Sequence, residues 1–349
     1  MIKSNTEIKK LTIGGMSMSS DHYSVIDSVS NKKNQGYLAT IVKVEGSAYR
    51  KEGTMMFISD KGMEKGLLSG GCVEEDLLAR IDLQKYAEPF LMEYDLRSED
   101  DLSWGQGVGC DGKIYIMVEP VTMETRQIFQ KIQHHLNNGK NVELIKKFNQ
   151  LNKQMENKIS VEAKKEYPNG TSFISEFICS PSDSDMISFT QSFEPQPKLI
   201  LYGAGPDAKP VVHFASKAGF YVILADWRQS YCKKENIPYA KEYIIGSPTE
   251  VMEAINPTEN DYVLTMTHSF MKDQEIVDYF QARKTKYLGL LGSKKRSERL
   301  LAGKKDKDWI RYPVGLAIHS ESPEEIAISI VAELIQLKNT KKSEAMVKQ

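Results

Sequence analysis

The chain has 349 residues, of which 40% are hydrophobic and 27% are charged. This length favours two domains with ordinary apolar cores. The 46 basic residues are balanced by 47 acidic ones, so the chain has no general charge excess to attract nucleic acid or an anionic membrane. No apolar run approaches the length of a membrane helix, and residues 1–20 lack the apolar core of a signal peptide. We therefore expect a cytoplasmic protein that binds neither nucleic acid nor membranes.

Alternating apolar residues predict a compact α+β domain in the first half of the chain. The alternation favours a helix at about 73–83 and four strands, at 37–44, 55–58, 90–94 and 113–118. A polar-faced helix is then expected over 125–138. Three short alternating runs follow, parted by turn residues, at 158–163, 172–179 and 186–193. They predict an antiparallel meander within 158–193.

A proline-rich segment marks the expected domain boundary. Pro195 and Pro197 remove backbone donors and stiffen the chain. We therefore expect one domain over 1–195, which includes the meander, and a second over 196–349.

The first candidate site is a glycine turn that leads into the helix at 73–83. Cys72 stands at this junction, after Ser69, Gly70 and Gly71 and before Glu74. The first N–H groups of a helix lack internal partners and carry the positive end of its dipole, so they stabilise a thiolate or an anion. Cys72 is thus predicted to be a functional thiol, or else a small residue that fills space at a helix end.

Two further residues of the first half are candidates. Arg50 ends the turn at 46–50, where a guanidinium suits phosphate or carbonyl recognition, although it could equally be a solvated turn residue. Cys110 lies in the glycine-rich segment 105–112, followed by the acidic Asp111. Together with Cys179 and Cys232, the four cysteines are widely spaced and form no C-x-x-C pair, so the pattern indicates neither a disulfide framework nor a zinc finger.

The apolar pattern of the second half predicts alternating strands and helices. A strand over 198–202 runs into a glycine turn at 203–208, followed by a helix at 209–218 and a strand at 221–225. Asp226 closes that strand, 23 residues after Gly203. The turn matches a dinucleotide-binding G-x-G-x-x-A pattern, in which the acid binds a ribose hydroxyl. A last helix is expected to begin after the N-cap Ser322, and its role is predicted to be packing rather than chemistry.

Polar residues follow the carboxyl ends of the expected strands, where doubly wound sheets bind ligands. Gly203 and Gly205 would let a phosphate approach, or would mark a tight crossing without a ligand, and Asp207 would repel a phosphate there. His268 follows a strand at 262–266, which favours a polar role. After a strand at 287–291, a phosphate receptor or a solvated helix start is expected at Gly292, Ser293 and Arg296.

These segments resemble a known family. The amino-terminal domain of XdhC/CoxI proteins, accessory factors in the maturation of xanthine dehydrogenase and carbon monoxide dehydrogenase, is similar to residues 46–50, 54–74 and 107–120. The family's Rossmann domain resembles residues 199–228, 266–268, 287–296 and 313–334. The resemblance covers most of the chain and is least over 125–195. It implies an α/β protein in which an α+β domain precedes a Rossmann-like, doubly wound parallel-sheet domain.

The resemblance also implies a function, that of a molybdenum cofactor chaperone in purine catabolism rather than a catalyst. Such a protein would hold molybdopterin, with or without a nucleotide, while a cysteine desulfurase exchanges an oxo ligand of the metal for sulfido. It would then deliver the cofactor to a xanthine-dehydrogenase-type apoenzyme. Cys72 would contact the molybdenum. The cofactor-binding residues would be Arg50, Ser69, Gly70, Gly71, Cys72, Glu74, Cys110, Gly203, Gly205, Asp226, His268, Gly292, Ser293 and Arg296. A homodimer is expected because C2 dimers are the commonest soluble oligomers.

Two alternatives remain open. The chain could be an NAD(P)-dependent oxidoreductase, in which Asp226 favours NAD and His268 is the acid or base. It could also be a non-catalytic docking subunit that only bridges partners. The hydroxylating subunit of xanthine dehydrogenase is not expected, because the cysteines are not grouped as Fe–S clusters require.

Overall fold

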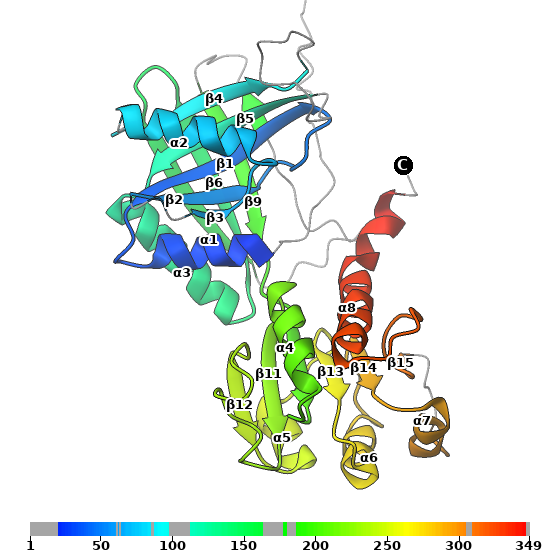
Figure 1. The fold of residues 1–349 in the computed structure, drawn as a ribbon. Helices are drawn as coiled ribbons and strands as arrows, with labels where there is room; N and C mark the ends of the chain where they lie inside the picture. Colours follow the sequence, from blue (N-terminus) through cyan, green and yellow to red (C-terminus); the bar gives the residue numbers. More distant parts are fainter. Residues whose placement is uncertain are drawn as a thin grey trace, which may run out of the picture. The chain divides into compact units, whose positions relative to one another are not determined.

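The computed structural model describes residues 20–60, 62, 64–84, 87–97, 112–162, 177–179, 186–304 and 309–346. The chain divides into two compact units, the first comprising Met1–Pro195 together with Glu344–Gln349 and the second Gln196–Ser343 (Figure 1). Among the described residues, no helix is long and apolar enough to cross a membrane.

The first unit begins with a five-stranded antiparallel sheet in the order β3-β2-β1-β5-β4. Its strands are β1 Gly36–Gly46, β2 Met55–Ser59, β3 Glu64–Gly66, β4 Phe90–Asp95 and β5 Gly112–Pro120. Helix α1 (Ser20–Ser30) precedes the sheet and α2 (Cys72–Gln84) follows β3. Apolar residues of α2 pack with one set of alternate strand residues, and those of α1 pack with the other set. The four predicted strands and the predicted helix are confirmed, whereas α1 and the short β3 were not predicted.

A four-stranded antiparallel sheet completes the first unit, in the order β7-β6-β9-β8. Its elements are helix α3 (Met123–Asn137) and strands β6 Asn141–Asn149, β7 Met155–Glu162, β8 Phe177–Cys179 and β9 Met186–Phe193. The three predicted strands are confirmed as β7, β8 and β9, but their predicted meander order is wrong, because the unpredicted β6 lies between β7 and β9. The buried residues of β6 are apolar except Lys146. This lysine interrupts the apolar alternation by which the sequence would have indicated a strand.

The second unit is a doubly wound, fully parallel sheet in the order β12-β11-β10-β13-β14-β15. In chain order this is 3-2-1-4-5-6, the order of dinucleotide-binding folds. The strands are β10 Lys198–Tyr202, β11 Tyr221–Asp226, β12 Glu242–Ile245, β13 Tyr262–Thr265, β14 Tyr287–Leu290 and β15 Ile310–Arg311. The expected Rossmann-like fold is confirmed.

Helices cover both faces of this sheet. They are α4 Ala208–Lys217, α5 Pro248–Ile255, α6 Phe270–Tyr279, α7 Lys294–Leu300 and α8 Pro323–Met346. Helices α4 and α8 contribute to one apolar cluster, and α5 and α6 contribute to the other. The loops at the carboxyl ends of the strands are therefore held by a core on each side of the sheet.

A buried ion pair joins the two sheets of the first unit. Lys146 of β6 pairs with Glu119 of β5, and the side chains are only 5% and 3% exposed. The Lys146 Nζ also lies 5.9 Å from the ring centroid of Phe129 on α3. Each charge has lost most of its hydration, so each depends on the other.

Removing one partner of this pair should destabilise the first unit strongly. We expect Glu119→Gln to lower the free energy of unfolding by about 3–5 kcal/mol, because it leaves an uncompensated buried ammonium. The double variant Glu119→Leu with Lys146→Met should recover most of that loss, because no charge remains buried. Urea unfolding followed by circular dichroism measures both values. Equal losses in the single and double variants would contradict this role of the pair.

Candidate functional site

The carboxyl ends of β10 and β13 meet at the topological switch point of the second unit. Ligands of doubly wound sheets bind in the crevice at such a point. Gly203, directly after β10, has a φ of +114°. A Cβ atom there would lie 2.4 Å from the carbonyl oxygen of Met266 in the loop after β13. Only glycine fits this approach, so Gly203 is required by the architecture whether or not a ligand binds.

His268 and Asp207 pair at these strand ends. The Nε2 atom of His268 lies 2.8 Å from Oδ2 of Asp207, and the two side chains are 66% and 25% exposed. His268 has a φ of +56°, a left-handed conformation that costs a non-glycine residue energy and is common at ligand sites. The other oxygen of Asp207 is close to Gly205, since a Cβ on that glycine would lie 2.6 Å from it. A carboxylate therefore stands beside the glycine turn where a pyrophosphate would be expected.

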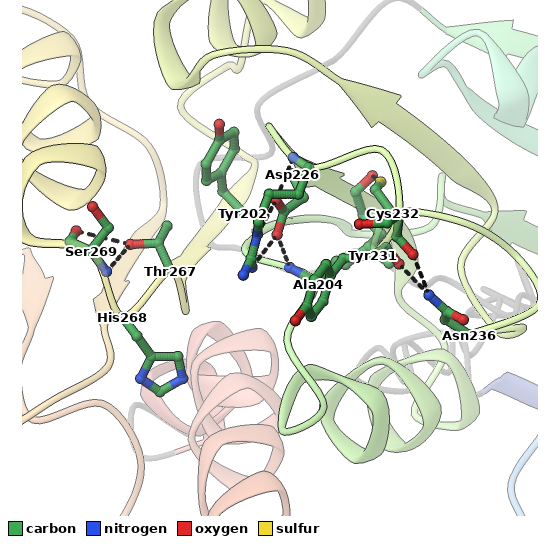
Figure 2. Close-up of polar contacts among 12 residues, drawn as sticks. Tyr202, Ala204, Asp226, Tyr231, Cys232, Asn236, Thr267, His268 and Ser269 are labelled. Carbon is green, nitrogen blue, oxygen red and sulfur yellow. Dashed lines mark hydrogen bonds and ion pairs between the residues drawn. The ribbon is translucent and has the colours of Figure 1, made fainter.

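The loop that carries His268 is anchored by buried polar contacts. Thr267 donates its hydroxyl to Asp273 of α6 at 2.7 Å. The amide of Ser269 donates to the Thr267 hydroxyl at 3.0 Å, a contact drawn in Figure 2. Asp273 also pairs with Arg296 of α7 at 2.6 Å. These contacts hold His268 in place, and Thr267 and Asp273 were not singled out from the sequence.

The predicted phosphate receptor after β14 has internal partners as well. The hydroxyl of Ser293 accepts a hydrogen bond from the amide of Arg296 at 3.3 Å and so caps α7. Gly292 has a φ of +136°, and a Cβ there would lie 3.3 Å from the side chain of Arg296. A phosphate at this position would compete with these contacts, and its binding stays a prediction.

Asp226, at the end of β11, is fully buried, and both of its carboxylate oxygens accept hydrogen bonds from the protein. Its Oδ2 accepts hydrogen bonds from the amide of Ala204 at 2.7 Å and from Nη2 of Arg228 at 2.9 Å. Its Oδ1 accepts from the amide and Nε of Arg228 at 2.7 and 3.0 Å. Figure 2 shows Asp226 facing Ala204 in the glycine turn. The acid predicted to bind a ribose hydroxyl thus joins the turn to Arg228.

The charge of Asp226 is stabilised by these contacts. Burial raises the pKa of a carboxyl group, but hydrogen bonds from Arg228 and from the amide of Ala204 outweigh it and hold the pKa of Asp226 below its ordinary value. Asp226 is therefore a buried, ionised acceptor at neutral pH.

In the first unit, Cys72 is the first residue of α2, as predicted. The Glu74 carboxylate accepts hydrogen bonds from the amides of Leu68, Ser69 and Gly71 at 2.8, 2.6 and 3.2 Å, and also from the Ser69 hydroxyl. These amides therefore bind Glu74 rather than an external anion. The signal for this role was present, because a glutamate at the third helical position is the capping-box position.

The other candidates of the first unit are less closely defined. Arg50 forms an ion pair with Asp21 of α1 at 3.1 Å and lies 5.6 Å from the ring centroid of Tyr49. Gly70 precedes Gly71 in the turn, and Cys110 lies outside the described residues. Among the residues whose side chains are described, no group of three or more His, Cys, Asp or Glu could hold a metal ion. The second unit brings together Gly203, Gly205, Asp226 and His268.

The two glycines of the turn should respond differently to substitution. We expect Gly203→Ala to lower the free energy of unfolding by about 3 kcal/mol, because its Cβ meets backbone atoms at a positive φ. Gly205→Ala should cost less than about 1 kcal/mol, because its Cβ meets only the movable end of Asp207. Thermal and urea unfolding of both variants measure the difference, and similar losses would show that the turn is not held as described.

Asp226→Asn should destabilise the protein in a pH-dependent manner. A carboxyl group whose pKa is lowered by folding contributes stability above its unfolded pKa of about 3.9, and this contribution is lost as pH falls through the folded value. We expect a loss of about 3 kcal/mol at pH 7 that shrinks below about pH 4. Asp207→Asn, in a more exposed pair, should cost about 0–1 kcal/mol. Urea unfolding across this pH range checks both, and a pH-independent loss would contradict the role of the charge.

Comparison with known proteins agrees with this architecture. Residues 199–334 match the XdhC Rossmann domain, and residues 30–94 match the XdhC and CoxI family. A protein of Bacillus subtilis (strain 168), named as a probable subunit of xanthine dehydrogenase, is 39% identical over 334 residues, which cover 93% of this chain and 99% of that protein. The "Uncharacterized protein YqeB" of Escherichia coli (strain K12) is 29% identical over 161 residues, or 44% of this chain and 29% of that one.

A solved structure extends the similarity to the fold. The crystal structure of a xanthine dehydrogenase from Bacillus halodurans matches with a TM-score of 0.76 and 39% identity, covering 93% of this chain and 97% of the other. The match includes both units, since it leaves only a small part of either chain uncovered. The chain described here belongs to the XdhC and CoxI family.

Proposed function

We propose that this protein is an accessory factor of a xanthine-dehydrogenase-type molybdenum hydroxylase, and that it binds the molybdenum cofactor for sulfuration and insertion. The observation that carries the proposal is the near full-length similarity to a protein named as a probable subunit of xanthine dehydrogenase. Four ungrouped cysteines in the whole sequence supply no Fe–S array, so a role beside the hydroxylating subunit fits the chain better than the hydroxylation itself.

The residues around Cys72 fit part of such a cofactor. The molybdenum cofactor would supply a metal bound by the dithiolene of molybdopterin, and a thiolate is a suitable soft ligand for such a metal. Cys72 stands at the positive end of α2, where a thiolate is stabilised, after a turn that Glu74 holds by hydrogen bonds. The amides of that turn do not fit the cofactor's phosphate, because Glu74 accepts their hydrogen bonds.

The NAD-dependent alternative is supported by the glycine turn at the switch point, but two contacts count against it. Asp226 uses both carboxylate oxygens on Ala204 and Arg228, which leaves them poorly placed to accept from a ribose. Asp207, paired with His268, puts a negative charge beside the turn where a pyrophosphate would lie. An NAD site would require both contacts to rearrange.

The proposal is tested by the variant Cys72→Ser, which keeps the size of the side chain but loses the soft sulfur. We expect the purified variant to retain much less molybdenum and pterin than the wild type, measured by metal analysis and pterin fluorescence. Cys232→Ser is the matched control, because that thiol is buried in the second unit, where its Sγ lies 3.4 Å from the carbonyl oxygen of Leu224 and 3.5 Å from that of Ile244. Equal retention in a folded Cys72→Ser protein would make Cys72 structural.

Delivery is tested by reconstitution. A hydroxylase that lacks only its molybdenum cofactor is supplied with molybdopterin, molybdate, a cysteine desulfurase with cysteine, and this protein. An electron acceptor is then added, and urate formation from xanthine is followed. We expect activity with the wild type and with Cys232→Ser, and little when the protein is omitted or carries Cys72→Ser. Turnover of xanthine by the chain alone, or no effect on any apoenzyme tried, would overturn the proposal.

A further inference from the structure

Arg228 is held in one orientation at the carboxyl edge of the Rossmann unit. Its Nε and Nη2 atoms donate to Asp226 at 3.0 and 2.9 Å. The guanidinium carbon lies 4.4 Å from the ring centroid of Trp227 and 4.0 Å from that of Tyr231. Trp227 itself stacks on Tyr202, with ring planes 17° apart. The guanidinium is thus fixed along one edge and against two aromatic rings.

This arrangement leaves the other edge of the guanidinium facing away from Asp226. An arginine has five N–H donors, and the bonds to Asp226 use two of them. Within the described part of the chain, the side-chain bonds of Arg228 all go to Asp226. The Arg228 side chain is 33% exposed whereas that of Asp226 is 0% exposed, so an approaching ligand meets the cation rather than the carboxylate.

The guanidinium also lies beside the glycine turn. Oδ2 of Asp226 accepts from the amide of Ala204 and from Nη2 of Arg228, so a single oxygen separates the turn from the arginine. The turn is at the switch point, where doubly wound sheets bind ligands. In such sheets an arginine near the end of the second strand accommodates a phosphate, and an acid accommodates ribose hydroxyls.

We propose that Arg228 is the receptor for a phosphate monoester in the Rossmann unit, and that Asp226 orients the guanidinium rather than binding the ligand. A phosphate monoester offers several charged oxygens that match the planar fork of a guanidinium. Because the fork is already immobilised, little side-chain entropy is lost on binding. The terminal phosphate of molybdopterin and the 2′-phosphate of NADP have this chemistry, so the assignment does not depend on the proposed function.

The test compares ligands that differ only in the phosphate monoester. Isothermal titration of the full chain is run with NADP against NAD, and with molybdopterin against its dephosphorylated form. In at least one pair we expect the phosphorylated ligand to bind roughly tenfold or more tightly, the size of one charge-assisted contact. The preference should disappear in Arg228→Gln and persist in Lys234→Gln, which removes an exposed positive charge from the same loop.

If NADP binds more tightly than NAD, the phosphate is that of a dinucleotide; if molybdopterin binds more tightly than its dephosphorylated form, the phosphate is that of the pterin. Arg228→Lys is the second variant, because it keeps a cation beside Asp226 if Arg228→Gln fails to fold, as judged by circular dichroism. In this variant the ratio of the two affinities, phosphorylated over unphosphorylated ligand, should fall by roughly threefold or more, because an ammonium lacks the bidentate fork. No preference in either pair, or a preference unchanged in the folded Arg228 variants, would overturn the assignment.

Discussion

The Asp226 carboxylate holds the carboxyl edge of the Rossmann unit together. Its oxygens accept hydrogen bonds from the amide of Ala204 in the glycine turn and from the amide and guanidinium of Arg228. A buried carboxylate requires such partners, because the hydration that it loses on folding is otherwise not replaced. The turn, the end of β11 and the arginine therefore form one hydrogen-bonded group. Any ligand at this edge meets a surface whose geometry depends on that carboxylate.

The same physical solution occurs in the first unit. Glu74 reaches back from α2 and accepts hydrogen bonds from the amides of Leu68, Ser69 and Gly71. Backbone amides in a turn lack the partners that a helix or sheet provides, and buried ones must find an acceptor. In each unit an acid near a glycine turn satisfies the protein's own amides. In the second unit the acid also fixes the guanidinium of Arg228, and in the first unit the turn that Glu74 holds leads into Cys72, the first residue of α2.

The loops at the switch point add a constraint of their own. His268 adopts a left-handed backbone conformation, and its loop is tied down through Thr267 to the buried Asp273. Strain of this kind persists only where the surrounding contacts enforce it. Asp207, the partner of His268, lies beside Gly205, and the missing side chain of Gly203 allows the loops after β10 and β13 to approach closely. A ligand that binds at the switch point must accommodate or displace the pair of His268 and Asp207.

Local patterns in the sequence determined the Rossmann unit and the start of α2, because periodicity and glycine placement act over a few residues. The tertiary structure alone decided the strand β6 and the role of Asp226. Lys146 breaks the apolar alternation of β6. Its charge can be buried because it pairs with Glu119, which is 27 residues away in the chain. By its place in the sequence Asp226 resembles a ribose-binding acid. In the fold it instead accepts a hydrogen bond from the amide of Ala204, 22 residues earlier in the chain. Which charges and amides become partners depends on which strands are neighbours, and that is a property of the folded sheet rather than of any local pattern.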